Sequence, residues 1–171
     1  MKIREEYKLP IIGSTEIIEV SGIENIPAKI DTGADTSAIW ASDIDMNEDG
    51  VLTFTLFGQE SPLYTGEKLK TTDYKAKKIR SSYGDKQIRY RVKLPLKLGD
   101  KRFETTFTLA NRSRNHFPVL IGRHTIEGRY LVDVSIFSAP RKKSEKSIKL
   151  SKELEEDPYQ FHQKYINKNK E

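Results

Sequence analysis

This chain has 171 residues and no cysteine, and its 30 Lys and Arg exceed its 25 Asp and Glu to give a formal net charge of +5. Such a length suits one ordinary domain with a tail, and the lack of cysteine excludes a disulfide scaffold, a cysteine-ligated zinc site and a thiol nucleophile. Because no apolar run approaches the roughly 18 residues of a spanning helix and the N-terminus lacks the apolar core of a secretory signal, we expect a cytoplasmic protein with no membrane segment.

Short apolar segments between turn residues predict a chain made mostly of β-strands. The expected strands are residues 51–57, 88–98, 103–109, 119–121 and 130–134. The Gly99-Asp100 turn makes the second and third of these strands a hairpin, and the continuous apolar run of the fourth is typical of a strand buried on both faces. Because no long helical period appears before the C-terminal tail, the pattern predicts an all-β fold, as a small barrel or sandwich.

Positive charge is dense between Lys68 and Lys93, where ten Lys and Arg stand against two acids. Strand alternation accounts for part of it, because the apolar residues of 88–98 fall on one face and basic residues such as Arg89 and Arg91 fall on the other. Only three aromatic residues, Tyr74, Tyr83 and Tyr90, stand among these cations, and we expect no stacking series of the kind that a groove for single-stranded nucleic acid uses. A basic nucleic-acid-binding β-barrel is therefore the weaker of the alternative functions.

We expect two parts, a β domain over residues 1–137 and a polar tail over residues 138–171 that is basic and partly helical or disordered. The tail holds nine Lys and Arg and six Asp and Glu, so it carries +3 of the net charge and the β domain carries +2. Within the tail, Asp157-Pro158 has the pattern of an N-cap followed by proline at the first helical position, which predicts the start of a short helix.

The sharpest local motif is Asp31-Thr32-Gly33, where an apolar lead-in delivers a carboxylate into a turn. Alone, this tripeptide is a weak signal that arises by chance in ordinary chains, and its glycine suits any loop that needs a positive φ. A second block, Pro118–Arg123, places Gly122 directly after the run Val-Leu-Ile. The two blocks together are more informative than either one.

These two blocks resemble the retropepsin-like aspartic peptidases. They are most similar to a bacterial subfamily labelled ATP-dependent zinc protease, which is found alongside enzymes that attach glutamate to proteins. Residues Asn111–Arg123 and the Ser-Ser hairpin at Arg80–Gly84 resemble segments of that subfamily. The resemblance covers residues 9–137, and it implies a small closed β-barrel of the acid protease type with one short helix after the Ile121-Gly122-Arg123 block.

The resemblance also implies a homodimeric aspartic endopeptidase, because this chain offers a single Asp-Thr-Gly. An aspartic peptidase activates water between two carboxyl groups that share one proton, since two close negative charges cannot both persist. The implied site residues are Asp31 as the catalytic carboxylate of each subunit, Thr32, Gly33 and Ala34 as the active-site loop, and Asp35 with Arg123 as an ion pair that braces the site.

A retropepsin also needs a mobile hairpin, or flap, that closes over the substrate. The hairpin at residues 79–90 is our candidate, and an ordinary connecting hairpin is the alternative. The candidate flap residues are Ser81, Ser82, Tyr83 and Gly84. The cations around this hairpin, with Arg80 and Arg89 as candidate contacts, favour an acidic, glutamate-rich peptide as the substrate.

A catalytically silent module of the same fold that binds a peptide or protein is the main alternative function. We expect no metal and no other cofactor. The three histidines, His116, His124 and His162, lack the spacing of zinc ligands, and isolated glycines form no phosphate-binding loop. The zinc and ATP of the subfamily label therefore have no counterpart that these residues reveal.

Overall fold

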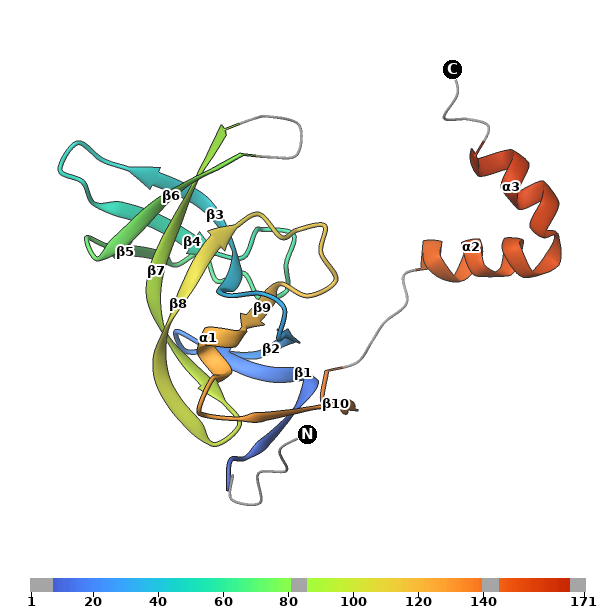
Figure 1. Cartoon of the computed structure of the whole chain (residues 1–171). Coiled ribbons are helices and arrows are strands. Elements are labelled where there is room, and N and C mark those ends of the chain that lie inside the picture. Colours follow the sequence, from blue (N-terminus) through green and yellow to red (C-terminus); the bar gives the residue numbers. More distant parts are fainter. Residues whose placement is uncertain (1–7, 81–85, 140–144, 167–171) are drawn as a thin grey trace. The chain divides into compact units, whose positions relative to one another are not determined.

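The structure is a computed structural model that describes residues 8–80, 86–139 and 145–166 (Figure 1). The chain divides into two compact units, residues 1–139 and 140–171. The elements of the first unit are β1 (Ile11–Val20), β2 (Ile23–Asp31), β3 (Ser37–Met46), β4 (Leu52–Leu56), β5 (Lys68–Thr71), β6 (Tyr74–Arg80), β7 (Lys86–Leu98), β8 (Lys101–Ala110), β9 (Val119–Gly122), α1 (Arg123–Ile126) and β10 (Leu131–Phe137).

Six of these strands close into a barrel, in the order β1-β2-β9-β3-β8-β7. The ring closes where β7 returns to β1, with Glu19 beside Lys97 and Val20 beside Leu96. Strand β10 pairs with β1 outside this ring, β6 pairs with β7, and β4 and β5 continue from β3. This closed barrel confirms the predicted all-β fold of the acid protease type, and the short helix α1 follows Gly122 directly.

The five strands expected from the sequence appear as β4, β7, β8, β9 and β10. Gly99 and Asp100 form the two-residue connection between β7 and β8, and Gly99 has a φ of 56°, in the left-handed region that glycine adopts without steric cost. Strand β9 is buried along most of its length between β2 and β3, as its continuous apolar run predicts.

The core fills the barrel with the inward side chains of alternating strands. On β7, Val92, Leu94, Leu96 and Leu98 are almost completely buried. Ile88 belongs to the same apolar face of the alternation, but its side chain is 60% exposed. The reason is geometric: the recorded pairing of β8 with β7 reaches only to Arg91, and the residues of β7 before it pair with β6 alone. Ile88 therefore lies on a two-stranded extension beyond the barrel.

The second unit contains the helices α2 (Glu145–Glu156) and α3 (Pro158–Ile166). The Asp157 carboxylate accepts a hydrogen bond from the Gln160 backbone N–H at 2.9 Å, so the Asp-Pro pair caps α3 as predicted. Glu153 of α2 accepts hydrogen bonds from Tyr165 and Lys164 of α3, which join the two helices. Across the ranges that the structure describes, no helix has the length and apolar character needed to cross a membrane.

Candidate active site

The path of the chain at the end of β2 determines where Asp31, the predicted catalytic residue, lies. Asp31 is the last residue of β2 and lies in register beside Gly122, the last residue of the parallel strand β9. Because β9 lies between β2 and β3, the chain must cross the end of β9 on its way from β2 to β3. Residues 32–36 make this crossing; they comprise the predicted loop residues Thr32, Gly33 and Ala34 with Asp35 and Thr36, and all five are called the active-site loop below. The topology thus brings together the two sequence blocks that lie far apart along the chain.

The active-site loop is held against the end of β9 by backbone contacts. The N–H of Arg123 donates to the Ala34 carbonyl at 2.8 Å, and the N–H of His124 donates to the Asp35 carbonyl at 3.2 Å. A Cβ atom built on Gly122 would lie 2.6 Å from the carbonyl carbon of Thr36 and 2.9 Å from the Ala34 oxygen. The glycine of the second block is therefore needed for this close approach.

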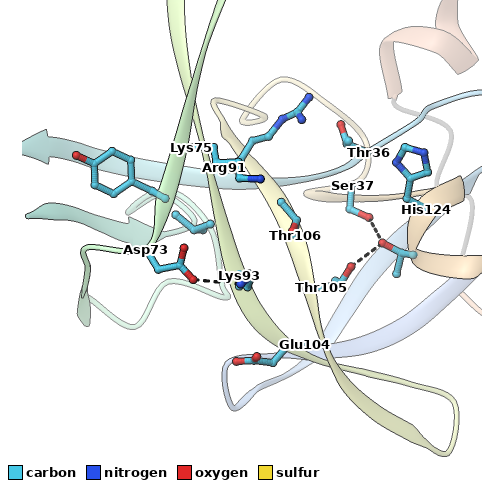
Figure 2. Close-up of a pocket in the computed structure, with 13 residues that line it drawn as sticks. Thr36, Ser37, Asp73, Lys75, Arg91, Lys93, Glu104, Thr105, Thr106 and His124 are labelled. Atoms are coloured by element: carbon cyan, nitrogen blue, oxygen red, sulfur yellow. Dashed lines mark hydrogen bonds and ion pairs between the residues drawn. The ribbon is translucent and has the colours of Figure 1, made fainter.

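A chain of hydroxyl groups beneath the loop joins three elements (Figure 2). Ser37 of β3 accepts a hydrogen bond from the Gly122 N–H at 3.1 Å, and its Oγ lies 2.7 Å from Oγ1 of Thr125. Oγ1 of Thr125 lies 2.9 Å from Oγ1 of Thr105 on β8. Ser37 and Thr125 are buried, so these bonds satisfy polar groups that would otherwise be costly to bury. This network was not predicted from the sequence, because nothing in the spacing of small hydroxyl residues reveals such distant partners.

The Asp31 carboxylate is half-buried and is oriented by its own loop. Its Oδ1 accepts a hydrogen bond from the Gly33 N–H at 3.1 Å, and its carbonyl accepts one from the Ala34 N–H at 3.2 Å. No hydrogen bond to Oδ2 comes from any residue that the structure describes. The loop thus fixes one carboxylate oxygen, and no described residue holds the other by a hydrogen bond.

Arg112 is a cation near Asp31 that was not among the predicted site residues. Its Nε donates to the Phe117 carbonyl at 3.2 Å, which ties the guanidinium to the segment that leads into β9. Burial lowers the pKa of Arg112, and the negative charge of Asp31 acts in the opposite direction, so the two side chains lie close enough to interact. Its place in the Asn111–Arg123 block was the one signal that could have pointed to it.

Asp35 and Arg123 form an ion pair, with 2.6 Å between Oδ1 and Nη2. Both side chains are more than half exposed, at 62% and 56%. Solvent screens such a pair, so its contribution to stability is expected to be about 1 kcal/mol or less. The pair joins the active-site loop to the start of α1, and its proposed bracing role stays a prediction.

The candidate flap is the hairpin of β6 and β7, and its tip lies outside the described residues. Ser81, Ser82, Tyr83 and Gly84 all belong to that tip. Arg80 ends β6 and is paired in register with Lys86, and Arg89 of β7 lies opposite Lys77 of β6. The two arginine candidates are therefore placed on the stem of the hairpin by the backbone.

The three histidines lie in different places. His116 packs its ring edge-to-face against Phe117, His124 belongs to α1, and His162 belongs to α3 in the second unit. In residues 8–80, 86–139 and 145–166, no three His, Asp or Glu side chains gather in a geometry that could hold a metal ion.

A cavity of about 360 Å³ opens beside the active-site loop (Figure 2). Thr36 of the loop, Ser37 at the start of β3 and His124 of α1 line one side of it. Residues of β6, β7 and β8 line the other side, with the cations Lys75 and Arg91 among them. The site therefore combines a carboxylate at the end of a barrel strand with an adjoining polar cavity.

The Asp-Thr-Gly loop thus leaves one strand of a closed β-barrel and crosses the glycine of the Ile-Gly-Arg block, which is the retropepsin-like arrangement that the sequence resemblance implies. A family model described as "RimB-like: Retropepsin-like aspartic endopeptidase RimB" matches residues 11–151. The chain belongs to this RimB-like family. The match extends past residue 137 into α2, so the family region is longer than the sequence resemblance indicated.

Curated relatives include proteins named "Probable alpha-L-glutamate ligase". One, from Desulfotalea psychrophila, is 30% identical over 143 residues, which are 81% of this chain and 31% of the relative. Another, from Shewanella pealeana, is 32% identical over 136 residues, which are 73% of this chain and 28% of the relative. The chain thus spans less than a third of the length of these relatives.

A solved structure also matches the fold. It is the crystal structure of a protein of unknown function from Legionella pneumophila, with a TM-score of 0.58 and 26% sequence identity. The match covers 76% of this chain and 97% of that chain.

Proposed function

We propose that this chain is an aspartic-type peptidase that hydrolyses peptide bonds as a homodimer, with one Asp31 carboxyl group from each subunit. The observation that carries the proposal is the crossing of the active-site loop over Gly122, which fixes Asp31 at the end of β2. One chain supplies one such carboxylate. A second copy related by a two-fold axis would supply the other from the same loop.

The chemistry follows from two carboxyl groups that share a proton. The ionised Asp31 takes a proton from the attacking water, and the protonated Asp31 donates its proton to the oxygen of the scissile carbonyl. The water oxygen bonds to the carbonyl carbon to form a tetrahedral intermediate. The carboxyl group that took the proton from water then gives it to the leaving nitrogen, the C–N bond breaks, and a hydroxyl group of the intermediate returns a proton to the other carboxylate. The Gly33 N–H holds Oδ1 in place for these transfers. The Arg112 guanidinium lies near the Asp31 carboxylate.

We infer that the substrate is an acidic, glutamate-rich peptide. Strands β6 and β7 pair Lys75 with Arg91 and Lys77 with Arg89, so cations line the sheet next to the cavity. A surface of one charge sign attracts a ligand of the opposite sign. The name of the relatives, alpha-L-glutamate ligase, refers to an enzyme that joins glutamate, and a domain shared with such enzymes would meet glutamate-rich chains.

A second candidate function, a silent module that binds the same peptides, is favoured by the coverage of the relatives. The region shared with this chain is 28–31% of proteins that are named for ligation rather than hydrolysis. In such proteins the shared domain would serve by holding an acidic chain near the ligase site. The fold and the cationic cavity serve this function equally well, and only the pair of Asp31 carboxyl groups distinguishes the two.

The decisive experiment compares hydrolysis by the purified chain with hydrolysis by an Asp31→Asn variant, using a glutamate-rich peptide and mass spectrometry of the products. We expect cleavage by the parent protein and none by Asp31→Asn, with parent-like cleavage by the control Asp49→Asn in an exposed loop. Cleavage that survives in purified Asp31→Asn would refute the aspartic mechanism. Binding of the peptide by the parent protein without any cleavage would favour the silent module. Sedimentation of the parent protein tests the dimer directly.

A further inference from the structure

The cavity beside the active-site loop has its charges arranged unevenly. Lys75, Arg91 and Lys93 are its cations, and Asp73 and Glu104 are its carboxylates. Lys93 is paired with Asp73 at 3.2 Å. Figure 2 shows Glu104 at the opposite end of the cavity from Arg91.

The register of the sheet agrees with this view. Arg91 lies beside Thr108 of β8, and Glu104 is four residues away along the same strand, or about 13 Å at the rise of a β-strand. The end of the cavity next to the active-site loop is therefore cationic.

Lys75 and Arg91 face each other directly across β6 and β7. Directly opposed like charges on one face of a sheet repel each other and lower stability. Neither side chain makes a hydrogen bond or an ion pair with any residue in the part of the chain that the structure describes. Arg91 is also half-buried, which strengthens the repulsion because less water screens it.

A similar pair elsewhere in the sheet shows how this chain balances such repulsion. Lys97 of β7 lies opposite Arg102 of β8. There, Glu19 accepts two hydrogen bonds from Arg102, at 2.7 and 2.9 Å. The protein thus supplies its own carboxylate to one like-charged pair, while the Lys75–Arg91 pair beside the active-site loop receives none from the described residues.

The register also connects this pair to Asp31. Asp31 lies beside Gly122, and a Cβ built on Gly122 would lie 2.6 Å from the carbonyl carbon of Thr36. Thr36 precedes Ser37, which lies beside Phe107 of β8. A straight row across the sheet therefore runs from Asp31 through Thr36 and Thr106 to β7. Four strand spacings of about 4.8 Å and a two-residue offset give an upper limit of about 20 Å from Asp31 to Arg91, which about six extended peptide residues would span.

We propose that Lys75 and Arg91, with the hydroxyl groups of Thr36 and Thr106, form an anion subsite that binds a side-chain carboxylate of the substrate several residues from the scissile bond. The substrate would supply the carboxylate that this like-charged pair lacks, as Glu19 does for Arg102. The proposal rests on the proposed function in that the substrate is acidic, but it does not require catalysis. It makes this pair a determinant of specificity and of the minimum length of the substrate.

The test measures the binding of a fluorescent octaglutamate peptide to the full-length chain in the Asp31→Asn background, where no cleavage interferes. We expect Arg91→Gln and Lys75→Gln each to weaken binding about tenfold, because each removes a charge-assisted hydrogen bond. The matched control Lys97→Gln removes one cation from the same strand outside the cavity and should leave the affinity within about twofold. A triglutamate peptide should bind weakly and respond little to any of the three variants.

Thermal melting separates a binding role from a structural one. Arg91→Gln should melt at or above the temperature of its parent, since the variant removes repulsion between like charges. Equal losses of affinity in Arg91→Gln and Lys97→Gln would overturn the subsite, as would unchanged affinity in both cavity variants. Tighter binding of an eight-nucleotide single strand than of octaglutamate, lost with the same two variants, would also overturn it in favour of nucleic acid. If the parent protein cleaves no peptide, and Arg91→Gln and Lys75→Gln still weaken the binding of octaglutamate, the peptidase function fails and the subsite stands.

Discussion

Replacing Gly122 by alanine would test whether the close crossing of the active-site loop holds this end of the barrel together. The added methyl group would meet three backbone atoms of the loop at 2.6 to 2.9 Å, well inside the distance of about 3.5 Å at which carbon atoms make favourable contact. Backbone cannot swing aside as a long side chain can. The loop must therefore move away from β9, and the hydrogen bond between the Arg123 N–H and the Ala34 carbonyl must lengthen.

The expected cost is the sum of two terms. Overpacking of a tight buried site costs about 1–3 kcal/mol, and a weakened backbone hydrogen bond adds about 1 kcal/mol. A free energy of unfolding reduced by about 3 kcal/mol corresponds to a melting temperature about 10 °C lower for a domain of this size. Differential scanning calorimetry measures the shift, and hydrogen exchange at the Arg123 amide reports on the crossing itself.

Gly128→Ala is the matched control. Gly128 has a φ of 69°, but a Cβ there would meet no atom within 4 Å. Its cost is therefore limited to the strain of a left-handed alanine, about 1–2 kcal/mol, with the Arg123 amide still protected. If Gly122→Ala melts no lower than Gly128→Ala and keeps its Arg123 amide protected, the argument from close packing is refuted.

Three further predictions concern residues outside the catalytic carboxylate. Arg123→Gln should lower stability by about 1 kcal/mol or less, because its pair with Asp35 is exposed; a loss above 2 kcal/mol in a urea titration would contradict this. Tyr130→Phe should cost about 1 kcal/mol, since it removes a buried 2.6 Å hydrogen bond to the last carbonyl of β7, and unchanged urea unfolding would refute the role of that bond. The bond from Arg102 lowers the pKa of Glu19 below its ordinary 4.5, so this stabilisation is present above pH 4.5 and is lost as the pH falls further. Melting scans from pH 6 to 3 should therefore show a smaller fall in melting temperature for Glu19→Gln than for the parent protein. Equal falls would refute a contribution of the Arg102–Glu19 pair to stability.

The two halves of the site were predictable to different degrees. Asp31 and Gly122 were found because each belongs to a short motif, and the two motifs together resemble those of the retropepsin-like aspartic peptidases. Arg112 was not assigned, because its nearness to Asp31 depends on how two distant segments fold together. Ser37 and Thr125 were missed for the same reason, since a hydroxyl group acquires its partner only through tertiary structure.

The strands show a similar division. Regular alternation predicted β7 and β8, because over most of the length of this hairpin one face lies toward the core and the other lies toward solvent. Strand β1 was not predicted, and its register shifts between Gly13 and Thr15, where a bulge interrupts the two-residue period. Helix α2 was not predicted either, because its apolar residues are few and its sequence is rich in Lys and Glu.

The insertion of β9 between β2 and β3 also sets the order in which this protein is assembled. The site cannot form until residues 119–122 reach two strands that were synthesised long before them. Closing a loop of about 90 residues costs roughly 4 kcal/mol of chain entropy, and such non-local pairing is slow. A nascent chain that still lacks β9 would leave the edges of β2 and β3 unpaired and prone to pair with other chains. Folding on the ribosome therefore delays the arrival of Asp31 at its working position until most of the barrel has been made.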